Sequence, residues 1–172
     1  MLVEPVDSFM VLGMSAYEGF KFQNAASASL DMPEEEEPQA SDAPAISSED
    51  FETLAERFKA QLGERVTAVK ASQRLSDSVA RLVDAEGALN QEMQRVYRMM
   101  DRDFEVPAKI LELNPRHPIL SRLKDYSAAD ELSVAVIEQI YESALLVEGL
   151  HPDPAGMIPR IQQLMQAALK KD

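Results

Sequence analysis

The sequence of 172 residues contains no cysteine. This absence excludes a disulfide framework, a thiolate zinc site and a cysteine nucleophile, and it fits a reducing compartment. No apolar run approaches the roughly 18 residues that a membrane-spanning helix needs. The first residues carry an acid, Glu4, and no basic stretch, so they do not resemble a signal peptide. We therefore expect a cytoplasmic protein with no membrane partner.

Motifs of known catalytic chemistry are also missing. The sequence has no glycine-rich phosphate loop, no Gly-x-Ser-x-Gly and no His-Glu-x-x-His. Its two histidines, His117 and His151, each precede a proline in an expected turn, which is typical of isolated surface histidines rather than of a metal pair. We expect no catalytic residue, no metal site and no cofactor site in this chain, and thus no enzyme.

Basic residues are scarce relative to acids, and the imbalance is local. The net charge is −13, but residues 31–52 contain nine acids and no base, so the remainder carries only −4. No basic stripe with interleaved aromatic residues predicts a nucleic-acid partner. Residues 31–50 also hold three prolines, which favours a flexible acidic linker over a functional acidic tail.

The linker divides the chain into three parts. Residues 1–30 suggest a short helix around 6–13 and an alternating strand, "FKFQNAAS", but they are too few for a core and look like the tail of another domain. Residues 51–172 form the expected folded domain. Its fold class is α+β, with helices around a small three-stranded sheet. The strands are expected in 65–72, 80–87 and 108–114, and helices in 47–64 and 118–126, the first capped by Ser47 or Ser48 and closed by Gly63.

A further helix is predicted from Leu89 to Met100. One face is apolar at helical spacing and comprises Leu89, Met93, Val96, Tyr97 and Met100. Periodicity alone favours packing of this face in the protein core. It leaves open that the face contacts a second copy of the chain or another molecule on which the protein acts. Arg95 and Arg98 flank the face, as in helices that lie on membranes, but the acidity of the chain argues against that role.

The last third predicts two helices, 128–149 and 153–172, joined as an αα-hairpin. Asp153 is expected as N-cap with Pro154 at the first position, and Pro159 should kink the helix or delay its start. Two copies of so apolar a hairpin could form a four-helix bundle, or both helices could cover the sheet, and the pattern leaves both open. For the bundle, the residues expected at the dimer interface are Val136, Ile140, Leu145, Ile158, Ile161, Leu164, Met165 and Leu169.

Several strings resemble the C-terminal part of the heat-shock protein 90 chaperones, in particular the bacterial branch of the high-temperature protein G type. These are "VKASQRLSDSVARLV", "LVDAEGALNQEMQRVYR", "ILELNPRHPIL", "SALLVEG", "DPAGMIPRI" and, upstream, "EPVDSFMVLGMSAYEGFKFQNAA". Their order and spacing cover nearly the whole chain outside the acidic segment. Val79 departs from the family, which has proline after "DS", so the geometry of this loop is not carried over.

The resemblance implies that residues 1–30 are the tail of a middle domain and that residues 51–172 are a C-terminal dimerisation domain. It implies a homodimer built by the hairpin as a four-helix bundle, and client contact with unfolded proteins through the apolar face of the Leu89–Met100 helix. The full-length family uses ATP and magnesium in a domain that this chain lacks. The alternative is a regulatory or small-ligand-binding helical domain of a larger protein, which would need convergent polar groups that the sequence does not display.

Overall fold

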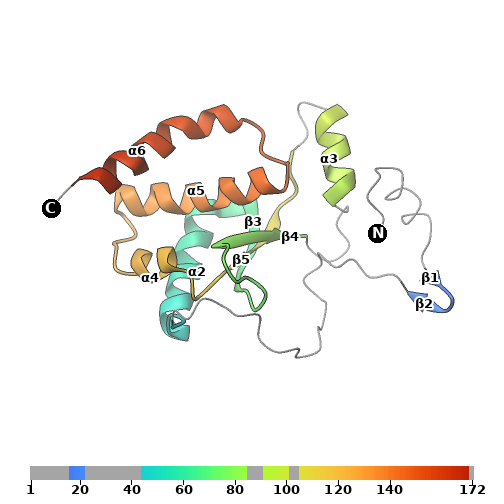
Figure 1. Ribbon diagram of the computed structural model, residues 1–172, viewed down its shortest axis with the longest axis horizontal. Helices are drawn as coiled ribbons and strands as arrows, with labels where there is room; N and C mark the ends of the chain where they lie inside the picture. The colour runs from blue at the N-terminus through green and yellow to red at the C-terminus, as the bar shows by residue number, and fades with distance from the viewer. Residues whose placement is uncertain (1–15, 22–43, 85–90, 101–104, 171–172) are drawn as a thin grey trace.

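The computed structural model describes residues 16–21, 44–84, 91–100 and 105–170, and it has the predicted α+β fold (Figure 1). A small hairpin is formed by β1 (Ala16–Tyr17) and β2 (Phe20–Lys21). The main body has three further strands, β3 (Val66–Ala71), β4 (Ala80–Val83) and β5 (Lys109–Leu113). Its helices are α2 (Ser48–Leu62), α3 (Gln91–Met100), α4 (Pro118–Leu123), α5 (Glu131–Val147) and α6 (Ile158–Leu169).

The sheet has the order β3-β5-β4, with β5 in the middle. β3 runs parallel to β5 and β4 runs antiparallel to it, so Leu111 of β5 is paired with Val69 on one side and Leu82 on the other. The side chains of Leu111 and Leu113 are fully buried. The three predicted strands are confirmed, and the central strand supplies the floor of the core.

α2 covers the sheet with a conventional amphipathic face. The Ser47 hydroxyl accepts a hydrogen bond from the backbone N–H of Asp50 at 3.1 Å, and the helix ends at Gly63, whose φ is 59°. Leu54, Phe58 and Leu62 point into the core and are buried. Residues 48–50, placed in the flexible linker by the sequence boundary, are the first turn of this helix, because the Ser47 cap starts it there.

α5 forms the opposite wall of the core and carries the largest share of the buried helical residues. Asp130 caps it, accepting from the backbone N–H groups of Leu132 and Ser133. Two residues expected at a dimer interface, Ile140 and Leu145, are buried in the core of a single chain. That burial accounts for their apolar character without a second copy, and their interface role stays a prediction.

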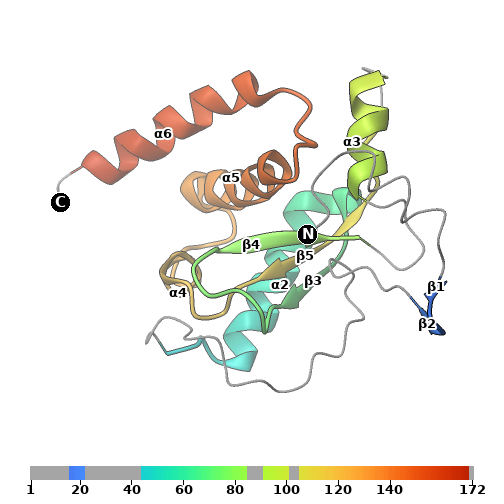
Figure 2. The ribbon, with the colours of Figure 1, turned by 45° about the vertical axis from the view of Figure 1, so that its right-hand side comes forward.

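α6 lies one layer farther out, against α5, as Figures 1 and 2 show. A 3₁₀ turn, Pro154–Met157, precedes the helix, and Asp153 makes no side-chain capping hydrogen bond. α6 itself begins at Ile158 with Pro159 in its first turn. A proline in the first turn removes an N–H group that has no acceptor within the helix. Of the two predicted effects of Pro159, the later helix start is observed and the kink is not. No residue of α6 is buried.

Some predictions lie outside the described residues. They are the short helix around 6–13, the strand beyond Lys21 and most of the acidic segment. The boundaries of residues 1–30, 31–50 and 51–172 as separate domains therefore stay predictions. Among the helices that the structure describes, none is long and apolar enough to cross a membrane.

Candidate functional site

α3 stands at the end of the α5–α6 hairpin and meets the protein with its polar side (Figures 1 and 2). The Gln94 side chain is fully buried, and its Nε2 donates to Asp84 Oδ1 at 2.9 Å. Arg95 Nε donates to the carbonyl of Glu148 at 2.7 Å, and Arg98 Nη2 donates to the carbonyl of Pro152 at 2.8 Å. α3 is therefore attached to the protein through polar contacts, whereas α2 is attached through its apolar face.

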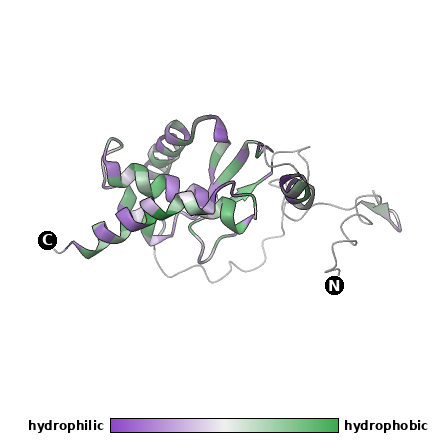
Figure 3. Cartoon of the chain, turned by 90° about the horizontal axis from the view of Figure 1, so that it is seen from above, coloured by the Kyte–Doolittle hydropathy of each residue, from purple (hydrophilic) through white to green (hydrophobic). Residues whose placement is uncertain are grey.

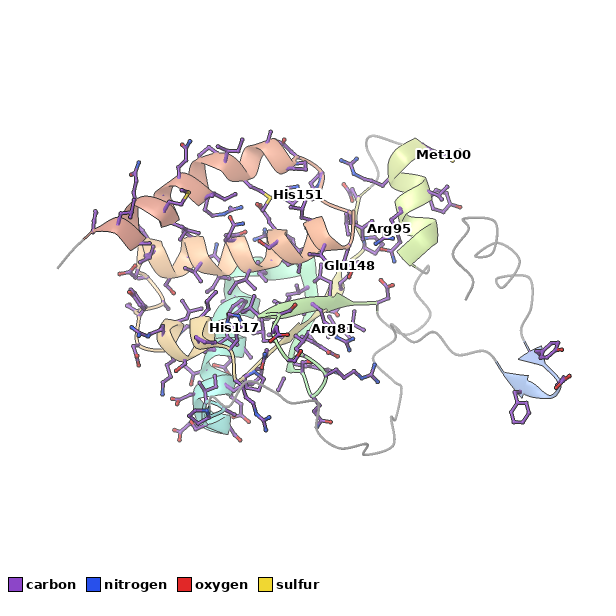
Figure 4. All side chains as sticks on the ribbon, viewed as in Figure 1. Arg81, Arg95, Met100, His117, Glu148 and His151 are labelled. Atoms are coloured by element: carbon purple, nitrogen blue, oxygen red, sulfur yellow. The ribbon has the colours of Figure 1, made fainter. Side chains whose placement is uncertain are left out.

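Two residues of the apolar face of α3 are exposed. Met100 is 81% exposed and Tyr97 is 42% exposed, while Val96 is half-buried. Figure 4 shows Met100 at the far end of α3, and Arg95 between the helix and Glu148. Of the other predicted client-contact residues, Leu89 lies outside the described residues, and Met93 belongs to α3 with a side chain that is not described. Core packing is thus not observed for Tyr97 and Met100.

Charged groups lie beneath α3. Lys109 of the central strand is buried and forms an ion pair with Asp84, which also accepts from Gln94 of α3. Burial raises the pKa of the Glu148 carboxyl; Lys109 and Arg95 oppose this effect, and Asp84 adds to it. These groups fasten α3 to the end of the sheet and to the end of α5.

The outer face of α6 is the second exposed apolar surface. Met165 is 59% exposed and Leu169 is 81% exposed, and Ile158 and Ile161 are also exposed. Figure 3 shows hydrophobic and hydrophilic residues alternating along this helix on the face seen from above. The remaining predicted interface residues, Val136 and Leu164, are half-buried.

A groove of about 400 Å³ lies between α4, α5 and α6. Val136 and Leu164 line it, so they face a space that a single chain does not fill. Most of the other lining residues are apolar: Pro118, Ile119, Leu123, Tyr126, Leu132, Ala167 and Ala168, with Arg122 and Ser133 as the polar members.

Both histidines have structural roles that the sequence did not reveal. The His151 side chain is only 5% exposed, so the prediction of a surface position is wrong. Its Nδ1 accepts from the backbone N–H of Asp153 at 3.1 Å, and its Nε2 lies 3.4 Å from Glu142 Oε2, between α5 and α6 (Figure 4). His117 caps α4, with Nδ1 accepting from the Ile119 N–H at 3.2 Å, and partial burial lowers the pKa of its imidazole. No group of side chains within the described ranges is arranged to hold a metal ion.

Comparison with known proteins identifies the family. Residues 1–172 match the family model described as Hsp90 protein. The chain belongs to the Hsp90 family. Its relatives include chaperone protein HtpG of Oleidesulfovibrio alaskensis, 37% identical over 97% of this chain, of Nitratidesulfovibrio vulgaris, 34% over 96%, and of Chlorobium phaeovibrioides, 31% over 98%. The chain spans 27% to 28% of the length of these relatives.

The family inferred from the sequence is therefore confirmed, and these relatives are named chaperones. The position of the chain in the C-terminal part of the family protein stays a prediction. The individual client and dimer residues stay predictions. Tyr97 and Met100 of α3 and four residues of α6 are exposed, Val136 and Leu164 line the groove, and Ile140 and Leu145 are in the core. Val96 is half-buried, and the side chains of Leu89 and Met93 are not described.

Proposed function

We propose that this chain is the dimerisation and client-contact module of an ATP-dependent protein-folding chaperone in the cytoplasm. In this proposal it corresponds to the C-terminal part of an Hsp90-family protein, with residues 1–30 as the end of the preceding middle domain. ATP and magnesium act in another domain of the family protein, and this module itself performs no catalysis. The observation that carries the proposal is that two amphipathic helices, α3 and α6, direct apolar side chains away from a core that is already closed.

The dimer surface is centred on α6. Ile158, Ile161, Met165 and Leu169 are all exposed on a helix that has no fully buried residue within one chain. At the end of α5, Leu146 and Val147 add further exposed apolar area. Full burial of each such side chain contributes roughly 1.5–3 kcal/mol, so pairing two hairpins as a four-helix bundle offsets the entropy of association.

The client surface is the outer face of α3. Its exposed Tyr97 and Met100 combine a flat amphipathic ring with a flexible thioether. Methionine adapts to irregular partners and tyrosine adds contact area with a polar tip, so the pair suits varied unfolded segments. Because α3 is held by its polar side, binding on the outer face needs no opening of the core.

The client role is tested with Tyr97→Ala combined with Met100→Ala. We expect the double variant to keep its thermal midpoint and to lose most of its affinity for a fluorescently labelled, permanently unfolded model protein, measured by anisotropy. Tyr126→Ala is the matched control, because Tyr126 has the same 42% exposure as Tyr97 and lies away from α3. Equal affinity of the double variant and the control would remove the client role of α3. Unfolding of the double variant would make that face part of the core.

The alternative function, a helical domain that binds a small ligand, finds one supporting observation in the groove between α4, α5 and α6. Its volume of about 400 Å³ lies within the range of ligand pockets, but Arg122 and Ser133 are its only polar lining residues within the described chain. A thermal-shift screen against a metabolite library decides the matter. The chaperone proposal predicts no hit, and a hit abolished by Leu164→Gln would favour the ligand site.

A further inference from the structure

The proposed client helix is joined to the proposed dimer hairpin by two arginines. Arg95 Nε donates to the carbonyl of Glu148 at 2.7 Å, and Figure 4 shows these two residues side by side. Arg98 Nη2 donates to the carbonyl of Pro152 at 2.8 Å. The two arginines are three residues apart on α3, so they extend from the same side of the helix. Both acceptors belong to the connection between α5 and α6. We call these two arginines with their two carbonyl acceptors the arginine clasp.

The connection is shaped to receive the clasp. α5 ends with Gly149 at a φ of 70°, where the N–H of Leu150 bonds to the carbonyl of Leu145 at 3.0 Å. Carbonyl groups at a helix end have no partner in the next turn, and the negative end of the helix dipole favours a cation there. A Cβ on Gly149 would lie 3.3 Å from Arg95 Nε. The glycine therefore serves both the turn and the close approach of Arg95.

The clasp decides which side of α3 faces outward. Gln94 adds a contact to the sheet through Asp84 at a third position on the polar side of the helix. Together with Gln94, the two arginines define a plane of attachment on the polar side. The opposite side, with Tyr97 and Met100, is then directed away from the body.

We propose that Arg95 and Arg98 are positioning residues that fix the outward direction of the client face and couple it to the α5–α6 connection. This inference rests on the proposed function, because it concerns the same client face and the same dimer hairpin. A rearrangement of the connection when two hairpins associate is transmitted through the clasp to α3. By thermodynamic reciprocity, client binding on α3 then biases association of the hairpins by the same factor.

The absence of cysteine allows a direct distance measurement. Met100→Cys on α3 and Gln162→Cys on α6 place two spin labels at exposed positions, and dilution with excess unlabelled protein leaves only distances within one chain. On this background we compare Arg95→Gln combined with Arg98→Gln against the control Arg57→Gln. Arg57 is a half-buried arginine that also donates to a backbone carbonyl, that of Tyr126 at 2.6 Å, but it belongs to α2.

We expect a narrow distance distribution in the parent and in the control, and a broadened or shifted one in the double variant. The same double variant, made without labels and with Met100 intact, should bind an unfolded model protein roughly five-fold more weakly, the lower end of typical coupling between sites. Gly149→Ala tests the coupling from the hairpin side, since its methyl group presses on Arg95 without any change in α3. It too should broaden the distribution.

Each outcome bears on a different claim. An unchanged distribution in the double variant overturns the positioning role, and if Gly149→Ala fails to fold, the double variant alone decides. A broadened distribution with unchanged client affinity supports the positioning role and removes the client role of α3. Loss of client binding in the Tyr97→Ala and Met100→Ala variant, together with an unchanged distribution in the arginine variant, leaves the proposed function standing and overturns this inference.

Discussion

Two pairs of amphipathic helices in this chain use their apolar faces in opposite ways. α2 and α5 turn them inward, where residues such as Phe58 and Ile137 are buried. α3 and α6 turn them outward, where Met100 and Leu169 are each 81% exposed. α2, α3 and α6 each have one apolar face, whereas α5 is apolar on more than one face and also exposes Val147. Periodicity therefore identifies the helix, and the rest of the fold decides whether its apolar face lies in the core.

The reason is the small size of the sheet. α2 packs on β3, and α5 packs on β4 and α2, which closes the core around the central strand β5. α6 is left to pack on α5, and α3 stands at the end of the hairpin (Figure 2). Within the described residues, the exposed apolar side chains of these two helices therefore lie outside the core.

The largest expected effect comes from a charge placed on the inward side of the hairpin. Ile140→Asp introduces a carboxylate into the core at a position that is 5% exposed. We expect a loss of more than about 4 kcal/mol in the free energy of unfolding, since a buried charge without a partner is among the costliest changes. Urea denaturation followed by far-ultraviolet circular dichroism measures it. A folded variant with ordinary stability would contradict the core position of Ile140.

Removal of the buried ion pair between Lys109 and Asp84, which lies beneath α3, should have the next largest effect on stability. Lys109→Met leaves Asp84 buried without its cation, which costs about 3–5 kcal/mol of unfolding free energy. Lys70→Met is the control, because Lys70 is exposed on the neighbouring strand. Urea melts of both variants give the comparison. Recovery of stability when Asp84→Leu is added to Lys109→Met would confirm that the stranded carboxylate causes the loss.

An aspartate placed on the exposed side of the hairpin should weaken association of two chains without unfolding either chain. Ile161→Asp lies on α6, so we expect the unfolding free energy of a single chain to change by less than about 1 kcal/mol and the dimer to dissociate. Light scattering coupled to size exclusion gives the mass, with Gln162→Asp as a control of equal charge at the next position. An unfolded Ile161→Asp chain would mean that α6 belongs to the core.

The smallest effect concerns the cap of α4. Partial burial lowers the pKa of His117, so the unfolded chain takes up this proton at higher pH than the folded chain. The contribution of the cap is therefore complete above the unfolded pKa and is lost as the pH falls through the interval between the two values. His117→Asn keeps an acceptor for the Ile119 N–H and should reduce this dependence by less than about 1 kcal/mol. Urea midpoints between about pH 5 and 8 test it, and an unchanged slope would contradict it.

The sequence predicts most of the local structure. The start of α2 at a serine cap, its end at Gly63 and the apolar runs of β3 and β5 depend on neighbouring residues, and these elements were found close to their expected ranges. The Asp130 cap of α5 was not predicted. The parallel pairing of β3 with β5 is different, because it joins segments about forty residues apart in the chain. Local patterns do not encode such a pairing.

The candidate site shows the same division. The helix Gln91–Met100 was predictable, but its inverted orientation depends on carbonyl acceptors more than fifty residues later, at Glu148 and Pro152. The hairpin residues look alike in sequence, yet Ile140 is buried and Ile161 is exposed. The burial of His151 was missed for a similar reason. The sequence indicates only a His-Pro turn, and the packing of two helices around this histidine is not visible in the local pattern.

Sedimentation equilibrium of the unmodified chain tests the central claim, that the outward faces are partner surfaces, most directly. One chain has a mass of 19.1 kDa. At tens of micromolar the account predicts a mass near twice that value, which returns to that of a single chain in Ile161→Asp. A single-chain mass for the unmodified protein across that concentration range would contradict it.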